Sequence, residues 1–254
     1  MYSPAEVARR YVETGKSKAA LPVGRMLLLG MLAGAFIALA GGSATFAVSY
    51  GGRLAGAAVF PAGLAMVLLA GSELFTGNCL LVIPLLERQL TWGRMLRSWG
   101  VVYLANVLGA GSVAALTVAA GTFDWVYESV VATAAAKAGL PFLTALLRGV
   151  LCNFLVCIAV WMSLAAQSVP GKLAAMYLPI FPFVLCGFEH SVANMFYLPA
   201  GILAAGRYGV AAEGLSWASM WTGNLLPVTL GNILGGCLVG VVYWAVYLRR
   251  GRRA

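Results

Sequence analysis

Charge and histidine are both scarce in this sequence. Only 10% of its 254 residues are charged, and His190 is the single histidine. One histidine cannot build a metal cluster, and the chain contains no CxxC or CxxCH spacing and no GxSxG of a serine hydrolase. We therefore expect no metal and no cofactor, and a membrane-embedded hydrolase or oxidoreductase has no support. The five cysteines are predicted to be small core residues.

Apolar residues, by contrast, form the majority of the chain. They make up 61% of the residues, and the mean hydropathy is +0.89, far above what the core of a soluble domain requires. Because about 20 apolar residues cross a hydrocarbon layer of about 30 Å, the pattern predicts an all-α membrane protein with six transmembrane spans. The expected spans are 26–48, 53–86, 98–120, 142–165, 173–205 and 225–248, of which the second and the fifth are broken by glycine and polar residues.

The basic residues indicate orientation. The net charge of +9 does not point to nucleic acid, because the basic residues collect between the apolar spans. With both termini in the cytoplasm, thirteen basic residues lie inside and four, Arg53, Lys137, Arg148 and Arg207, lie elsewhere. This positive-inside bias predicts a multi-pass protein of the cell inner (cytoplasmic) membrane, surrounded by lipid.

The two ends of the chain are predicted to be cytoplasmic. Ser3-Pro-Ala-Glu6 has the spacing of a capping box, with proline at the first helical position. Residues 1–25 are therefore expected to contain an amphipathic helix at the membrane interface. A signal peptide is disfavoured, because the first span is too long for a signal h-region. Residues 249–254 form a basic tail.

An internal repeat divides the single transport domain. Residues 71–78 and 187–194 share the pattern G-x-E-x-x-x-x-N, and each segment interrupts the second span of a three-span half. The first repeat covers 26–122 and the second covers 142–248. Since three is an odd number, the halves must be inserted in opposite directions, which gives an inverted 3+3 repeat. Non-helical backbone near the midplane is tolerated only where protein covers it or a polar cavity runs past it, so the repeat predicts a central pathway.

The two breaks resemble the signatures of the formate/nitrite transporter family. The first reads GSELFTGN, the second reads GFEHSVAN, and residues 151–163 and 224–232 are also similar to the family. The resemblance implies an aquaporin-like fold of six helices, a homopentamer and a separate pore in each subunit. It further implies that Thr76 and His190 face each other at the pore centre and that Lys137 lies in the outer vestibule. The other implied pore residues are Asn153 and Asn232 as polar contacts near the centre, Leu64, Leu74 and Phe75 at the cytoplasmic constriction, and Phe60, Val156 and Phe183 at the periplasmic one.

The residue types themselves support some of these roles. His190 is an ionisable residue inside a helix break, where its burial must be compensated, although a neutral packing histidine is the alternative. The Thr76 hydroxyl can cap a half-helix and also donate to a passing anion. The constriction residues cannot be distinguished from core packing by sequence. Four residues at corresponding positions are expected to tie the loops together rather than carry protons: Glu73, Glu189, Asn78 and Asn194.

The predicted function is transport of a small monovalent anion or its weak acid. Formate is the first choice, nitrite and hydrosulfide follow, and lactate or acetate also fit. Lys137 would draw the anion inward, and a proton arriving through water or His190 would let it cross as the neutral acid. Both a channel mechanism and a proton-symport mechanism are compatible with the sequence. A water or glycerol channel would share the expected fold, but its Asn-Pro-Ala loops are absent, because Asn78 and Asn194 precede Cys79 and Met195.

Overall fold

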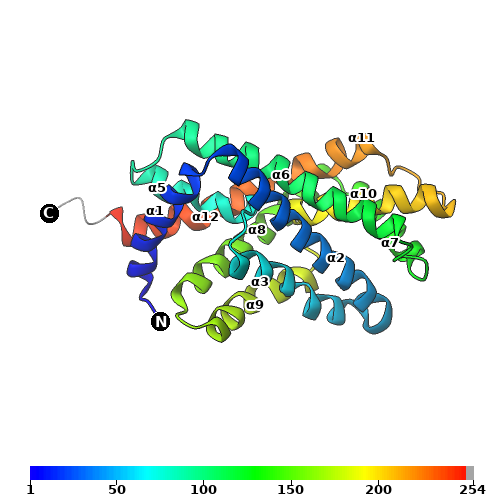
Figure 1. Ribbon diagram of the computed structural model, residues 1–254, viewed down its shortest axis with the longest axis horizontal. Helices are drawn as coiled ribbons and strands as arrows, with labels where there is room; N and C mark the ends of the chain where they lie inside the picture. The colour runs from blue at the N-terminus through cyan, green and yellow to red at the C-terminus, as the bar shows by residue number, and fades with distance from the viewer. Residues whose placement is uncertain (250–254) are drawn as a thin grey trace.

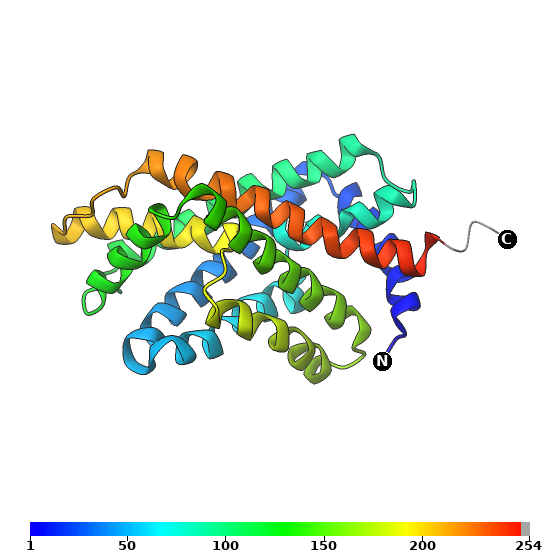
Figure 2. The same ribbon diagram turned by 180° about the vertical axis from the view of Figure 1, so that it is seen from behind.

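The protein is helical throughout residues 1–249, the part that the computed structural model describes, and this part contains no strand. Figures 1 and 2 show one elongated body, with α1, α5 and the end of α12 at one end and α7 and α11 at the other. All of the predicted tail except Arg249 lies outside the described residues. The helices are α1 (Pro4–Ala20), α2 (Val23–Val59), α3 (Pro61–Ala70), α4 (Phe75–Asn78), α5 (Val82–Leu86), α6 (Trp92–Ala119), α7 (Tyr127–Ala138), α8 (Phe142–Ala165), α9 (Val169–Leu185), α10 (Ser191–Tyr208), α11 (Trp217–Ser219) and α12 (Leu226–Tyr247).

Helix α1 begins with the predicted capping box. The Ser3 hydroxyl accepts a hydrogen bond from the Glu6 backbone N–H at 3.3 Å, and the Glu6 carboxylate accepts one from the Ser3 backbone N–H at 2.8 Å. The Ser3 hydroxyl also donates to Glu6 Oε2 at 2.8 Å, and the donations from the Ser3 backbone and hydroxyl lower the pKa of Glu6. Val7 and Tyr11 are buried on one face of α1 while Arg9 stays exposed, so α1 has an apolar and a polar face, and its place at the membrane interface stays a prediction.

The first half contains the predicted break after α3. Helical hydrogen bonding continues from α2 almost to α3, but Gly52 adopts φ 69° and ψ −171°, and α3 packs back against α2 beyond this kink. The non-helical segment runs only from Gly71 to Leu74. The prediction that residues 76–78 also interrupt the span was wrong, because they form α4. Helix α4 can begin at once since the Phe75 N–H is satisfied by the side-chain carbonyl of Asn106 at 3.0 Å.

The second half repeats this arrangement between α9 and α10. Asn194 was also expected to interrupt its span, but it lies inside α10, whose first turn is capped by the side chain of His190. Within residues 1–249, four helical stretches are long and apolar enough to cross a membrane: Val23–Ala70, Trp92–Ala119, Phe142–Ala165 and Trp217–Tyr247. The shorter apolar helices, Phe75–Leu86 and Val169–Leu185, each adjoin one of the breaks.

Glycines bring two helix pairs into backbone contact at corresponding places. A Cβ atom added at Gly109 of α6 would lie 2.0 Å from the Met31 carbonyl oxygen of α2. One added at Gly235 of α12 would lie 2.1 Å from the Val150 carbonyl oxygen of α8. Only glycine permits such approaches, and small residues are the usual means by which membrane helices pack closely. These two crossings hold the α2–α6 and α8–α12 pairs against the breaks.

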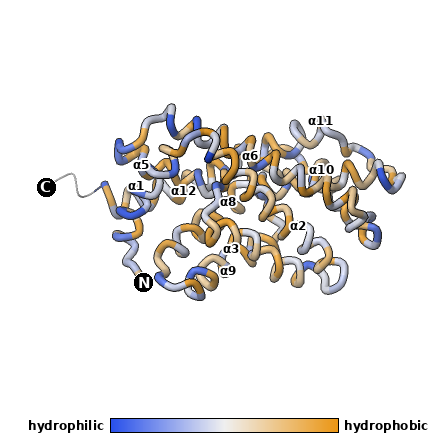
Figure 3. Tube along the Cα trace, in the orientation of Figure 1, coloured by the Kyte–Doolittle hydropathy of each residue, from blue (hydrophilic) through white to orange (hydrophobic). Residues whose placement is uncertain are grey.

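The outer surface of the helices is apolar. Figure 3 shows hydrophobic residues along the middle of the long axis, with hydrophilic segments concentrated toward its ends and in the turns. Large side chains four residues apart are exposed on single helix faces, for example Leu104 and Leu108 on α6 and Leu230 and Leu234 on α12. Such faces suit contact with lipid or with another apolar surface, because exposing large apolar side chains to water is unfavourable.

Candidate functional site

The first break is held in place by one asparagine side chain. The carboxamide nitrogen of Asn106 donates to the carbonyl oxygens of Gly30 at 2.7 Å and Glu73 at 3.0 Å, while its oxygen accepts from Phe75 N–H. Gly71 opens the break with φ 75°, a conformation that favours glycine. All the hydrogen-bonding capacity of Asn106 except one lone pair is thus used to fix backbone that has no helical partner.

The second break has the same support from Asn232. Its carboxamide nitrogen donates to the carbonyl oxygens of Gly149 at 2.9 Å and Glu189 at 3.0 Å, and its oxygen accepts from Ser191 N–H at 2.9 Å. Gly187 opens this break with φ 70°. Asn232 was implied to be a polar contact of the pathway, and the structure places its side chain behind the loop, fully buried among backbone groups.

Each break also contains a buried glutamate paired with a lysine. Lys18 Nζ of α1 lies 2.8 Å from Glu73 Oε1, and Lys137 Nζ of α7 lies 2.9 Å from Glu189 Oε1. The two lysines come from helices outside the repeated spans and from opposite ends of the molecule, as Figure 1 shows for α1 and α7. Both glutamates are about 95% buried, so their charges need these partners.

The second carboxylate oxygen of each glutamate binds an asparagine in the helix that follows the break. Asn78 Nδ2 donates to Glu73 Oε2 at 2.8 Å, and Asn194 Nδ2 donates to Glu189 Oε2 at 2.6 Å. The glutamates were expected to accept from the loop itself, and the structure instead gives them side-chain partners from neighbouring helices. Each carboxylate thereby ties a helix start to a lysine on an outer helix.

Thr76 and His190 meet between the two breaks. Thr76 Oγ1 lies 3.0 Å from His190 Nε2, and both side chains are buried. His190 Nδ1 accepts a hydrogen bond from the Ala193 backbone N–H at 3.0 Å, so in the neutral ring the proton is on Nε2. Nε2–H therefore donates to the Thr76 oxygen. The Thr76 hydroxyl hydrogen is left free to donate elsewhere.

Asn153 supports Thr76 from behind. Its carboxamide nitrogen donates to the carbonyl oxygens of Thr76 at 3.2 Å and Asn232 at 2.6 Å. The side chain is fully buried and lines neither of the two cavities that His190 lines. Thr76 itself also lines neither of them and reaches them through its contact with His190. The arrangement joins the start of α4 to α8 and α12, so it fixes the direction of the Thr76 side chain.

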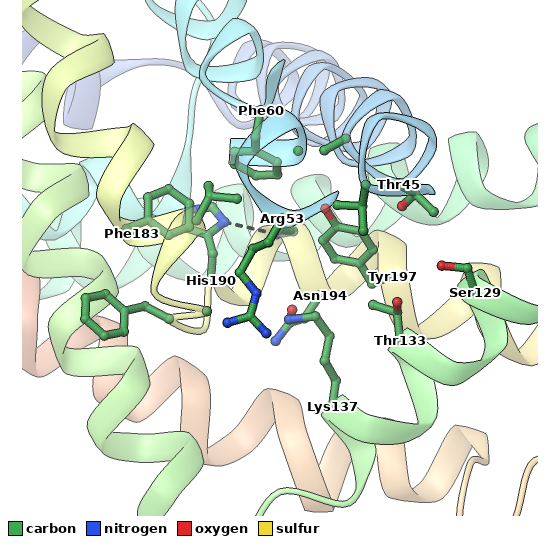
Figure 4. Close-up of a pocket in the computed structure, with 17 residues that line it drawn as sticks. Thr45, Arg53, Phe60, Ser129, Thr133, Lys137, Phe183, His190, Asn194 and Tyr197 are labelled. Carbon is green, nitrogen blue, oxygen red and sulfur yellow. Dashed lines mark hydrogen bonds between the residues drawn. The ribbon is translucent and has the colours of Figure 1, made fainter. Parts of the chain in front are cut away.

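Three cavities follow one another through the part of the chain that the structure describes. The α7 cavity, of about 190 Å³, lies beside α2, α7, α9 and α10 and is lined by Lys137, Asn194 and His190 among others (Figure 4). The central cavity, of about 10 Å³, is apolar except for His190. The α1 cavity, of about 110 Å³, is lined by Lys18, Ser72 and other residues of α1, α3, α4 and α8.

Shared lining residues show where the cavities meet. Phe60 and Phe183 line both the α7 cavity and the central cavity, and their rings contact edge to face with centroids 5.6 Å apart. Leu64 and Leu74 line both the central cavity and the α1 cavity. Val156 lines the central cavity alone. Two apolar narrowings therefore separate a small central space from a lysine-bearing cavity on each side.

Phe75, implied to belong to the narrowing on the α1 side, points elsewhere. It lines none of the three cavities, and its ring contacts Tyr103 and Trp99 edge to face with centroids 4.9 Å and 6.3 Å apart. Its backbone is anchored on Asn106, so the side chain lies toward α6. The structure thus brings Leu64 and Leu74 to the narrowing and places Phe75 in the packing behind it.

Known proteins are similar to this chain over nearly its whole length. A profile of the formate/nitrite transporter family matches residues 5–245. The chain belongs to this family. It is 38% identical to a probable formate transporter of Methanothermobacter thermautotrophicus, covering 97% of each chain, and 36% identical to the formate channel FocA of Escherichia coli K12, covering 97% of this chain and 94% of the relative.

Solved structures of the formate/nitrite transporter family have the same fold. An FNT family ion channel superposes with a TM-score of 0.86 at 28% identity, covering 94% of this chain and 98% of that one. A pentameric formate channel with formate bound superposes with a TM-score of 0.79 at 31% identity, covering 89% and 98%. The all-α fold predicted from the sequence is confirmed.

Several cavity residues of this formate/nitrite transporter were missed by sequence reasoning. In the α7 cavity these are Thr45, Arg53, Ser129, Thr133 and Tyr197, and in the α1 cavity they are Tyr11, Thr14, Lys18 and Ser72. The four-residue spacing of Ser129, Thr133 and Lys137 was a usable signal, because it places three polar groups on one helix face. Lys18 had no such signal, since α1 lies outside the repeat.

Proposed function

We propose that this protein conducts a small monovalent anion, formate first, across the cell inner membrane. The observation that carries the proposal is the contact between Thr76 Oγ1 and His190 Nε2, 3.0 Å apart, because His190 is the one polar residue, among those described, that lines the central cavity between two lysine-bearing cavities. A pathway that concentrates anions at both mouths and offers one polar contact between them suits a small anion or its acid. Membership of the family and the formate named for its relatives support this substrate class.

The proposed route begins in the α7 cavity on the outer side. Lys137 attracts the anion there, because its charge lies at the cavity wall even though Glu189 shares it. The substrate passes Phe60 and Phe183, reaches Thr76 and leaves between Leu64 and Leu74 into the α1 cavity. Lys18, paired with Glu73, has the corresponding role on the cytoplasmic side.

The substrate is proposed to cross the apolar narrowings as the neutral acid. A bare anion would lose several kcal/mol of hydration between two pairs of apolar side chains, and the neutral acid loses far less. The Thr76 hydroxyl hydrogen is free, so it can donate to the carbonyl oxygen of the acid as it passes. The proton comes from vestibule water or through His190, which can take a proton on Nδ1 only by giving up the bond to Ala193.

The proposal includes orientation and assembly. The α1 end is assigned to the cytoplasm, from the positive-inside bias, and the α7 end to the outside. The exposed leucine faces of α6 and α12 are assigned to lipid or to neighbouring protomers. A homopentamer with one pathway in each protomer is proposed by analogy with the structural relative described as a pentameric formate channel.

Transport in proteoliposomes tests the function directly. The purified protein is reconstituted, and uptake of radiolabelled formate is compared with uptake of nitrite and hydrosulfide at two external pH values. We expect saturable formate uptake that empty liposomes lack, faster at the lower pH. Faster uptake of nitrite or hydrosulfide than of formate would transfer the assignment to that anion, and absence of uptake for all three would refute it.

A further inference from the structure

A second cation lines the α7 cavity, and no acidic side chain neutralises it. Within residues 1–249, Arg53 takes part in none of the ion pairs and its side chain donates no hydrogen bond to the protein. The cavity lining contains no aspartate or glutamate. Lys137, the other cation, is 2.9 Å from a carboxylate oxygen of Glu189. The uncompensated positive charge of this cavity is therefore that of Arg53.

The local backbone sets the position of Arg53. Gly52 has φ 69°, which strongly favours glycine, and the resulting kink starts a new helical direction at the next residue. Figure 4 shows the Arg53 side chain extending from this turn over the cavity, on the side where Lys137 and Asn194 lie. Arg53 lines the same cavity as Phe60 and Phe183, the residues of the outer narrowing.

The facing wall offers hydroxyl groups at regular spacing. Ser129, Thr133 and Lys137 lie four residues apart on α7 and all line the cavity (Figure 4). Neither the Ser129 nor the Thr133 hydroxyl is bound to another described residue. The guanidinium can only donate and the two unbound hydroxyls can donate, so together these groups suit the acceptor atoms of an anion.

We infer that Arg53, with Ser129 and Thr133, forms an oxyanion subsite that favours planar two-oxygen anions before they reach the pore. The planar guanidinium donates two parallel N–H bonds to the two oxygens of formate or nitrite. Hydrosulfide presents a single sulfur, so it cannot accept the two bonds in this parallel geometry. Lys137, whose ammonium group acts as a point charge, attracts all these anions alike. This inference rests on the proposed function, and it assigns the choice among its anions to Arg53.

Three variants separate charge from shape. Arg53→Gln removes the positive charge, and Arg53→Lys keeps the charge but removes the planar two-donor guanidinium. The control, Arg207→Gln, removes an arginine of α10 that lies outside the cavity and donates to the Ala119 carbonyl oxygen. The half-saturating concentrations for formate and hydrosulfide are measured in proteoliposomes at low and high ionic strength. Binding is measured separately, as broadening of the ¹³C-formate NMR signal by the detergent-solubilised protein. Size-exclusion chromatography checks that each variant assembles.

We expect Arg53→Gln to raise the half-saturating formate concentration about fivefold at low ionic strength, a modest change because the group is exposed. Arg53→Lys should restore hydrosulfide fully and formate only in part, and Arg207→Gln should match the unsubstituted protein. Equal recovery of both anions by Arg53→Lys would show that charge alone acts and would overturn the subsite. So would identical curves for Arg53→Gln and Arg207→Gln. If the protein broadens the ¹³C-formate signal in a way that depends on Arg53 but does not transport formate, the subsite is supported and only the proposed function is refuted. If the unsubstituted protein does not broaden the signal, the subsite is refuted.

Discussion

Replacing Thr76 by valine removes one hydroxyl and almost nothing else. Valine keeps the branched shape, so the packing against Asn153 and His190 is retained, but two hydrogen bonds are affected. The His190 Nε2–H, 3.0 Å from Thr76 Oγ1, loses its acceptor, and a substrate at the narrowing loses its donor. The hydroxyl therefore contributes to stability through the first bond and to transport through the second.

The two effects have calculable sizes. A buried donor left without a partner costs about 1 to 3 kcal/mol, so Thr76→Val should lower the free energy of unfolding by that amount. A donor lost from the highest point of the transport barrier raises that barrier by a similar amount. Since about 1.4 kcal/mol changes a rate tenfold, formate uptake should fall roughly 5- to 150-fold.

Two further variants control this experiment. Thr76→Ser retains the hydroxyl and should recover most of the uptake. Thr45→Val makes the same chemical change in the α7 cavity, where the hydroxyl already donates to the Gly41 carbonyl oxygen of its own helix at 3.0 Å, and should leave uptake near normal. Uptake and thermal stability of the reconstituted proteins are measured together. Thr76→Val protein with unchanged formate flux would refute the role of the hydroxyl in the pathway.

Three other predictions follow from the fold. Gly109→Ala should cost about 3 kcal/mol and impair assembly, because its Cβ would lie 2.0 Å from a backbone oxygen, whereas Gly111→Ala on the same helix meets nothing within 4 Å and should be neutral in thermal unfolding. His190→Asn keeps a cap for Ala193 without a titratable ring, so uptake should lose its rise with falling external pH; a preserved pH profile would assign the proton to bulk water. Single cysteines at Lys172 and Arg207 should react with impermeant reagents from the cytoplasmic and the outer side respectively, and the reverse pattern would invert the topology.

Much of the fold was predictable from local sequence patterns. The capping box at Ser3 and Glu6 was predictable because its hydrogen bonds join residues three apart. The two breaks were predictable because glycine and glutamate in an apolar run are costly unless the helix ends there. The extent of the breaks was not predictable: residues 76–78 are helical because Asn106, about thirty residues away, replaces the missing helical bond to Phe75.

The sequence by itself determined the membrane class and the repeat, since these depend on composition and on short spacings, while the family resemblance implied that Thr76 and His190 face each other. Only the tertiary structure decided which groups compensate the buried charges. Lys18 reaches Glu73 from a helix outside the repeat, and Arg53 remains without an acid although it is no less basic than Lys137. It also decided the tautomer of His190, through the Ala193 N–H. These outcomes depend on distances between segments remote in sequence, and electrostatic and hydrogen-bond energies are set by those distances.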